Sequence, residues 1–166
     1  MRGGTVRQRN RQAGFSMAEM LIVIAFIGIA VAIGIPLVNE QVRIAEVRSS
    51  ADDLALHLRA ARMIAVAKHK TIVFTVNVDP ANSFSYTTTD NSAIFTGSDP
   101  KVRGPFFMPK RVKIAAGSDG QINFFQNGAV DFSSSIILES QVSDSLERWT
   151  ATVNTIGLTT LAHQRI

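Results

Sequence analysis

The sequence predicts an α+β fold, in which one long N-terminal helix packs against an antiparallel β-sheet. Three observations predict it. Residues 20–38 carry no charged side chain and are long enough to cross about 30 Å of hydrocarbon as a helix. A helical pattern then continues to about residue 70, and from residue 71 apolar and polar residues alternate as they do in strands. We therefore expect a transmembrane first half and an amphipathic second half of the helix.

The leader, residues 1–14, contains most of the chain's excess charge. The whole sequence has 17 basic and 13 acidic residues and a net charge of +4, and the leader contributes Arg2, Arg7, Arg9 and Arg11. Without these arginines, 17 − 4 = 13 basic residues balance 13 acidic ones, so the remaining chain is formally neutral. A neutral body argues against nucleic acid as a partner. Arginines before an apolar segment also place the N-terminus in the cytoplasm and the rest on the outer face of the membrane.

The segment after the apolar run is expected to be the helix of a soluble domain. Its apolar residues recur at spacings of three and four, which forms one stripe along a helix. They are Val47, Ala51, Leu54, Leu58, Ala61 and Ala65. Residues 15–38 are thus the expected transmembrane helix, and residues 39–70 the expected amphipathic helix.

Residues 71–166 are expected to form a β-rich globular domain. Strands are predicted at residues 71–79, 84–86, 112–115, 121–125, 129–132, 136–140, 148–154 and 158–162. The segment 91–109 is rich in Gly, Pro, Ser and Asp and is expected to be a long loop. Asp119-Gly120 and Asn127-Gly128 are the strongest hairpin signals, because both central residues of a type I′ turn need a positive φ.

Composition and motifs argue against an enzyme. The chain has no cysteine, which excludes disulfides, thiol catalysis, a thiolate metal site and a lipid anchor on cysteine. His57, His69 and His163 show no ligand spacing, and the sequence contains no HExxH, P-loop or GxSxG motif. We expect no catalytic residue, no metal and no cofactor.

The residues before the apolar run carry the functional signal. Gly14-Phe15-Ser16-Met17-Ala18-Glu19 places a carboxylate at the start of a membrane segment. A charged group at the centre of a membrane helix costs about 2.5–3.5 kcal/mol on insertion scales, so such a residue usually has a partner. Cleavage after Gly14 would give Phe15 a new α-amine one helical turn before Glu19. The two charges could then pair within one chain or between neighbouring chains.

This motif resembles the class III signal of type IV pilins and pseudopilins. The resemblance implies that a prepilin peptidase cleaves after Gly14, removes the leader and methylates Phe15, and that Glu19 acts in subunit assembly. It extends to Gly28 and Pro36, which match positions where family helices loosen in assembled filaments. The partners it implies are the prepilin peptidase, other pilin or pseudopilin subunits and the membrane. The location it implies is the bacterial inner membrane, with a periplasmic C-terminal domain.

Two other interpretations of the N-terminus stay open. An ordinary signal peptide also has a basic start and an apolar run, and Ala30-Val31-Ala32 offers it a cleavage site. An uncleaved membrane anchor is the second. A conventional signal peptide would not begin its apolar run with Glu19, which favours the pilin interpretation.

The soluble part resembles the GspH/FimT group of minor subunits. The resemblance rests on the long helix and on a strand–Gly–strand unit around Trp149 and Gly157. It implies a minor pseudopilin of a type II secretion system. The alternative is a FimT-like minor type IV pilin in pilus assembly, DNA uptake or adhesion. FimT-type pilins that take up DNA carry arginines after the terminal glycine, whereas this chain has Leu158-Thr159-Thr160.

One basic cluster remains as a candidate surface patch. It consists of Lys101, Arg103, Lys110, Arg111 and Lys113. Phe106 and Phe107 lie between these cations, and cations with aromatic rings can bind single-stranded nucleic acid. The favoured alternative is a solvated loop whose phenylalanines anchor in the core.

Overall fold

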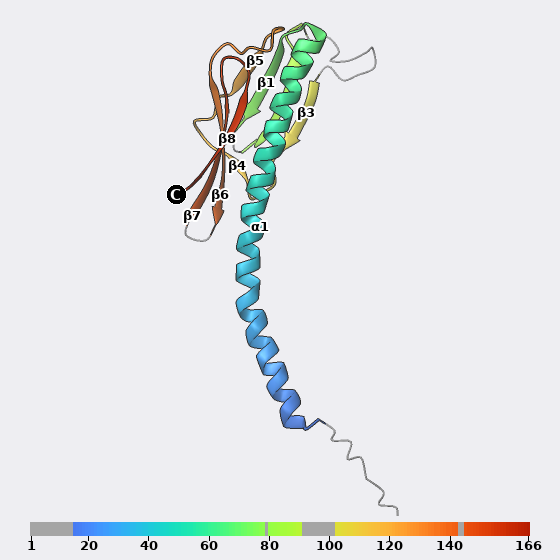
Figure 1. Cartoon of the computed structure of the whole chain (residues 1–166), viewed down its shortest axis with the longest axis vertical. Helices are drawn as coiled ribbons and strands as arrows, with labels where there is room; N and C mark the ends of the chain where they lie inside the picture. The colour runs from blue at the N-terminus through green and yellow to red at the C-terminus, as the bar shows by residue number, and fades with distance from the viewer. Residues whose placement is uncertain (1–14, 79, 91–101, 143–144) are drawn as a thin grey trace, which may run out of the picture. The chain divides into compact units, whose positions relative to one another are not determined.

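The computed structural model describes residues 15–78, 80–90, 102–142 and 145–166, and Figure 1 shows its elements. Within these described ranges, one helix, α1 (Met17–Lys68), is followed by eight strands. They are β1 (Ile72–Asn77), β2 (Ser83–Thr88), β3 (Val102–Phe107), β4 (Lys113–Ile114), β5 (Gln121–Phe124), β6 (Ser134–Val142), β7 (Ser145–Val153) and β8 (Thr159–Arg165). The chain divides into two compact units, Met1–Val38 and Asn39–Ile166. The boundary falls where the apolar part of α1 ends.

Local hydrogen bonds define both ends of α1. The Ser16 hydroxyl accepts a bond from the Ala18 amide at 3.3 Å, so Ser16 caps the first turn. At the other end the Lys70 amide donates to the Ala65 carbonyl at 3.2 Å and the His69 amide to that of Val66 at 3.4 Å. His69 has a φ of 50°. This is a Schellman ending, with a histidine where glycine is commonest.

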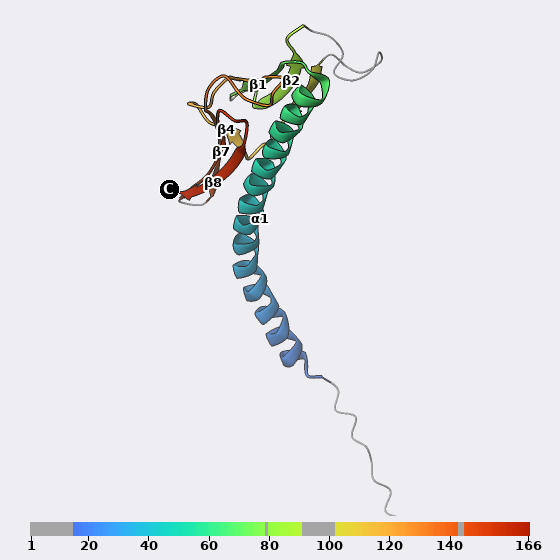
Figure 2. The same ribbon diagram turned by 45° about the horizontal axis from the view of Figure 1, so that its top comes forward.

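The strands form two antiparallel sheets rather than the single sheet expected. One has the order β3-β2-β1-β5 and the other the order β4-β6-β7-β8. The second sheet is the more regular, because β6 pairs with β7 over nine residue pairs, from Ser134↔Val153 to Val142↔Ser145. Figures 1 and 2 show strands of both sheets beside the domain half of α1.

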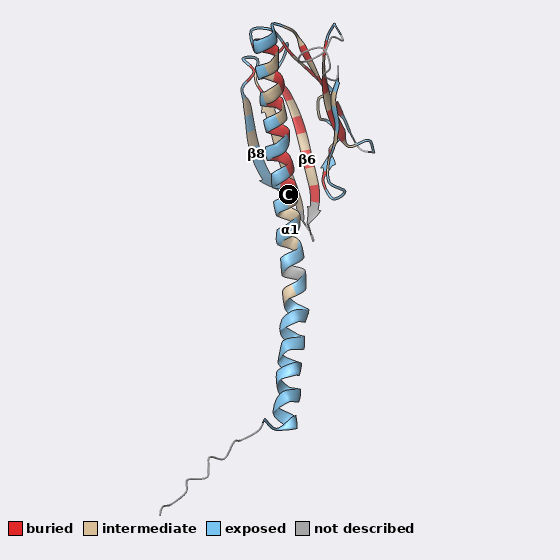
Figure 3. Ribbon diagram, turned by 90° about the vertical axis from the view of Figure 1, so that its right-hand side faces the viewer, coloured by how far each residue is buried: buried red, intermediate tan, exposed pale blue. Residues whose placement is uncertain are grey.

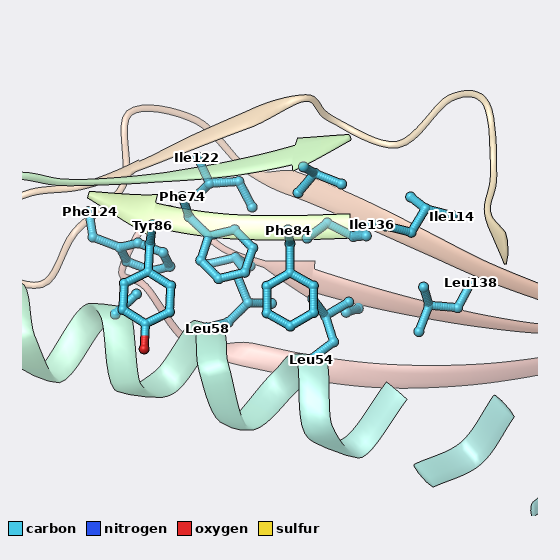
Figure 4. Packing of buried hydrophobic residues seen from close by; sticks show 14 of the residues in the cluster. Leu54, Leu58, Phe74, Phe84, Tyr86, Ile114, Ile122, Phe124, Ile136 and Leu138 are labelled. Carbon is cyan, nitrogen blue, oxygen red and sulfur yellow. The ribbon is translucent and has the colours of Figure 1, made fainter. Parts of the chain in front are cut away.

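The core lies between α1 and the inner faces of both sheets. All six residues of the predicted stripe are at most 1% exposed, so that prediction is confirmed. In the first sheet Phe74 stacks with Phe84 and Tyr86, at ring-centroid distances of 5.4 and 5.8 Å. Leu54 and Leu58 of the helix lie against these rings, and Ile136 and Leu138 come from the second sheet (Figure 4). Such a core holds the domain half of α1 firmly against the sheets.

Four local predictions were wrong. β3 lies inside the expected loop 91–109. The sequence did not predict it because Gly104 and Pro105 are uncommon inside strands. Both residues are tolerated there because β3 is an edge strand. The expected strand 129–132 is reduced to one bridge between Val130 and Phe124.

Asp119-Gly120 does not form a hairpin, since β4 pairs with β6 whereas β5 pairs with β1. Neither of its residues has a positive φ, and at Asn127-Gly128 only the glycine does. The second turn is therefore not of type I′, although Gly128 does donate to the Phe125 carbonyl at 2.8 Å.

A close approach of two loops fixes the turn between β7 and β8. A Cβ at Gly157, whose φ is +77°, would lie 2.0 Å from the Gly128 carbonyl oxygen. Arg62 of α1 holds both loops, because its Nε donates to the Gly128 carbonyl and its Nη2 to the Ile156 carbonyl, each at 3.0 Å. Glycine is thus required at position 157 both by the backbone conformation and by space.

Candidate functional site

The N-terminal end of α1 carries the predicted assembly residues that the structure describes. Phe15 precedes the helix and is 77% exposed, and Glu19 is an exposed residue of the first turn. Gly14 lies outside the described residues. Ser16 and Glu19 have the spacing of a capping box, and a carboxylate near a helix N-terminus is electrostatically favourable.

The apolar part of α1 buries almost nothing within the chain. Among the described residues α1 is the one helix long and apolar enough to cross a membrane, and none of its most apolar stretch is buried. The side chains that are more than half exposed include Met20, Leu21, Ile22, Ile24, Phe26, Ile27, Ile29, Ile33 and Ile35. Figure 3 shows this contrast with the domain half of the helix. So much exposed apolar surface requires lipid or other protein segments around it.

Gly28 and Pro36 do not interrupt the helix in this structure. α1 runs continuously through both positions. A Cβ at Gly28 would meet nothing within 4 Å, so no contact in the chain requires glycine there. Proline has no amide hydrogen and removes one bond of the helical ladder, and glycine is a poor helix former. The two residues therefore weaken the helix locally, and loosening of the helix at these positions stays a prediction.

The residues of the predicted basic patch line two different cavities. Arg103 of β3 and Tyr86 line an apolar groove of about 410 Å³ beside α1. Burial raises the pKa of the Tyr86 hydroxyl, and the positive charge of Arg103 opposes this shift. Lys110, Arg111 and Lys113 line a separate cleft. Lys101 lies outside the described residues.

The phenylalanines between these cations also separate. The Phe106 ring packs over His57 with a centroid distance of 4.2 Å and stacks on Phe84 at 5.3 Å, so it belongs to the core edge. Phe107, in contrast, is 71% exposed. Since Phe106 is already stacked within the domain, it offers no free platform for a nucleotide base.

The cleft at Lys110, Arg111 and Lys113 also has walls from the helix and the second sheet. Arg43 of α1 and three residues of β6 and β7, Glu139, Ser140 and Leu146, complete the lining. Glu139 in this lining and Glu46, which contacts the lining residue Arg111, are both paired with arginines. Arg111 lies 3.7 Å from Glu46, and Glu139 lies 2.6 Å from the Arg148 guanidinium.

A buried carboxylate that the sequence analysis missed lies at the same end of the domain. The side chain of Glu147 is 2% exposed and lies 2.5 Å from His163 and 3.3 Å from Arg165. Arg165 also contacts Glu40 of α1 at 3.3 Å, and His163 stacks on Trp149 at 4.8 Å. A buried charge needs such partners. The cluster therefore attaches the last strand to the part of α1 at which the domain begins.

The signal for this cluster was present in β8 but needed the strand register. In the observed pairing, His163 lies opposite Trp149 and Arg165 lies opposite Glu147. The two basic residues are two apart, so they share one face of the strand. The sequence alone did not say which residues they face.

No protein-family model and no curated protein matches the chain. Solved structures do resemble it. The minor pseudopilin EpsH from the type 2 secretion system of Vibrio cholerae has a TM-score of 0.53 at 14% identity, covering 70% of this chain and 96% of that one. The type IV minor pilin FimU of Pseudomonas aeruginosa has a TM-score of 0.53 at 17% identity, with coverages of 71% and 89%. The chain thus has the α+β pilin-like fold, and these two structures are of minor subunits.

Proposed function

We propose that the chain is a minor pseudopilin, a structural subunit of the pseudopilus of a type II secretion system. The observation that carries this proposal is the unburied apolar half of α1, headed by the motif from Gly14 to Glu19. The fold supports it, because the solved structures that resemble the chain are minor pilins and pseudopilins. Its role is structural: the chain is a substrate of the prepilin peptidase and not itself an enzyme.

The proposed cycle follows from the two halves of α1. The leader arginines keep the N-terminus in the cytoplasm while the apolar half spans the inner membrane. The peptidase cleaves after Gly14 and methylates the amine of Phe15. On assembly, the apolar halves of neighbouring subunits pack together, and Glu19 pairs with the N-terminal ammonium group of an adjacent chain. Both charges leave the lipid as a neutral pair.

Sequencing the N-terminus of the mature protein tests the first step. We expect a chain that begins at methylated Phe15. A mature chain that begins at any other residue contradicts the proposed processing.

A substitution of Glu19 tests the second step. Glu19→Val removes the carboxylate, so we expect largely normal cleavage but strongly reduced crosslinking to the other pseudopilins of the system. Asp52→Val is a matched control, because Asp52 is an exposed acid in the domain half of α1. Unchanged crosslinking of the Glu19 variant would remove this residue from the assembly mechanism.

A minor type IV pilin is the second candidate, since FimU resembles the chain with the same TM-score as EpsH. The residues after Gly157 favour secretion, because the DNA-binding arginines of FimT-type pilins are missing there. Deletion of the gene separates the two functions. Loss of protein export with normal piliation supports the pseudopilin, whereas loss of surface pili or of DNA uptake with normal export supports the pilin.

A further inference from the structure

We propose that a pocket on the folded domain binds an arginine side chain of a neighbouring pseudopilin. The pocket measures about 340 Å³ and lies between the domain half of α1 and the segment in which β3 ends. It is lined by Ser49, Ser50, Asp53, Phe84, Phe107, Met108 and Pro109, and we call it the Asp53 pocket. All of these residues belong to the compact unit Asn39–Ile166. The identity of the partner, though not the pocket, rests on the proposed function.

The Asp53 carboxylate gives the pocket a negative charge. Among the described residues that line it, Asp53 is the one that carries a charge. Its side chain is 62% exposed, and it lies 3.9 Å from His57, which is too far for a hydrogen bond. Lys110 and Arg111 follow Pro109 in the sequence, but they line a different cleft. The pocket is therefore suited to a cation.

The polar groups around the carboxylate offer acceptors rather than donors. The hydroxyl groups of Ser49 and Ser50 both donate to the Glu46 carbonyl, at 3.0 and 2.8 Å. The Met108 amide donates to a carbonyl of the β1–β2 turn at 3.0 Å, and Pro109 has no amide hydrogen. An ionised carboxylate also accepts hydrogen bonds only. A ligand with donors and no acceptor, such as a guanidinium group, complements this lining.

An exposed aromatic ring favours a planar cation in the same pocket. Phe107 is 71% exposed, whereas its neighbour Phe106 packs at the edge of the core. A guanidinium group stacks on an aromatic face and pairs with a carboxylate at the same time, so one arginine can contact both Phe107 and Asp53. The apolar lining residues Met108 and Phe84 suit the methylene stem of such a side chain.

Other classes of ligand fit the Asp53 pocket less well. A phosphate group would be repelled by the carboxylate and would meet acceptors where it needs donors. The described part of the chain contains no group of three or more His, Asp or Glu residues that could hold a metal ion. A lysine ammonium group is a compact point charge and cannot lie flat on a ring as a guanidinium does. Arginine is therefore the side chain that uses both the charge and the ring.

A peptide titration of the full-length chain tests the pocket directly. The isotope-labelled protein in detergent micelles is titrated with acetyl-Gly-Arg-Gly-amide, and its backbone amide signals are followed by NMR. We expect saturable shifts at Ser49, Asp53 and Phe107. The same peptide with citrulline in place of arginine has nearly the same shape but no charge, and it should cause no saturable shift. Equal shifts with the two peptides overturn the inference.

Two substitutions separate the charge from the ring. Asp53→Asn should weaken binding of the arginine peptide roughly two- to five-fold, because it removes an exposed ion pair. Phe107→Leu keeps an apolar side chain but removes the ring face, and the expected loss is again roughly two- to five-fold.

Asp52→Asn is the matched control, because Asp52 is the exposed residue next to Asp53 and lies outside the lining. It should bind the arginine peptide like the wild type. Unchanged amide signals far from each substitution confirm that the domain is folded. Equal binding by the Asp52 and Asp53 variants overturns the inference.

Crosslinking in cells identifies the partner. Phe107→p-benzoylphenylalanine keeps an aromatic ring and makes the pocket photoreactive. We expect an adduct on another pseudopilin close to an arginine, and replacement of that arginine by glutamine should remove most of the adduct. An adduct on a second copy of this chain, or one that survives the arginine replacement, overturns the inference. Peptide binding without any adduct on a pilin-like subunit contradicts the proposed function instead, while the arginine pocket stands.

Discussion

The two halves of α1 are equally helical but find their packing partners in different places. In residues 39–68 apolar side chains form one stripe, and that stripe is buried against the chain's own sheets. In residues 17–35 apolar side chains occur on every side of the helix and remain exposed. A one-sided stripe needs a single packing layer, whereas a helix that is apolar all round needs a partner that surrounds it. The first half is therefore built for lipid or for a bundle of helices.

The largest test of this difference compares two leucines of the same helix. Leu58 is 0% exposed and Leu21 is 60% exposed. We expect Leu58→Ala to lower the free energy of unfolding of the domain by about 2–5 kcal/mol, because it leaves a cavity in the core. Leu21→Ala should leave it unchanged. Urea unfolding of the full chain, followed by protease susceptibility, measures both, and equal effects would contradict the division of α1.

The reverse test places a charge in each half. Ile24 and Leu56 are similarly exposed, at 65% and 62%. Ile24→Lys should disfavour membrane insertion by roughly 3 kcal/mol, because a lysine then enters the hydrocarbon. Leu56→Lys should have almost no effect, since its side chain faces water. The fraction of protein that resists carbonate extraction measures insertion, and retention of the Ile24 variant at the wild-type level would argue against a spanning helix.

A third test concerns the side-chain hydrogen bonds that attach the domain half of α1 to two loops. Arg62 donates to the carbonyl groups of Gly128 and Ile156. Its removal leaves both acceptors without this charged donor, so Arg62→Ala should lower the free energy of unfolding by about 2 kcal/mol. Arg59, an exposed arginine one turn away, is the control, and Arg59→Ala should change it by less than about 0.5 kcal/mol. The same urea experiment measures the free energy of unfolding of both variants.

The smallest expected effect is at the end of the helix. His69 holds a φ of 50°, which glycine adopts without strain. We expect His69→Gly to raise the free energy of unfolding by about 0.5–1 kcal/mol, provided that the Schellman bonds of residues 69 and 70 remain. A lower urea midpoint for the variant would show that the histidine side chain stabilises the domain by more than its backbone strain destabilises it.

Most of the fold follows from local patterns, because each of them fixes which face of an element is buried. The stripe from Val47 to Ala65 and the alternation of Ile72, Phe74 and Val76 both placed the correct side chains in the core. The division into two sheets was not predictable in this way. Alternation shows which side of a strand is buried but not which strand pairs with it. β4 pairs with β6, although β5 lies between them in the sequence and belongs to the other sheet.

The same distinction between local patterns and long-range contacts applies to the candidate site. Phe15 and Glu19 were found because their signal is contained in six consecutive residues, and their processing and pairing remain predictions. The cluster around Glu147 was missed because it joins two strands and a helix, and Glu40 is more than a hundred residues from Arg165. Arg103 and Lys110 are neighbours in sequence, yet they line different cavities. Proximity in the chain was misleading here because Arg103 lies near the start of β3, whereas Lys110 follows the end of that strand.

The two arginine ties also have a mechanical consequence. Arg165, at the end of β8, pairs with Glu40 of α1, and Arg62 of α1 binds the loops that contain Gly128 and Ile156. Glu40 and Arg62 are 22 residues apart on α1, which is roughly 33 Å of helix. If the chain is a fibre subunit as proposed, tension on the fibre would run along α1. The sheet is then loaded in shear between two fixed points, and both ties must yield together before it can slide. The two attachments would then share a load that is applied along the helix.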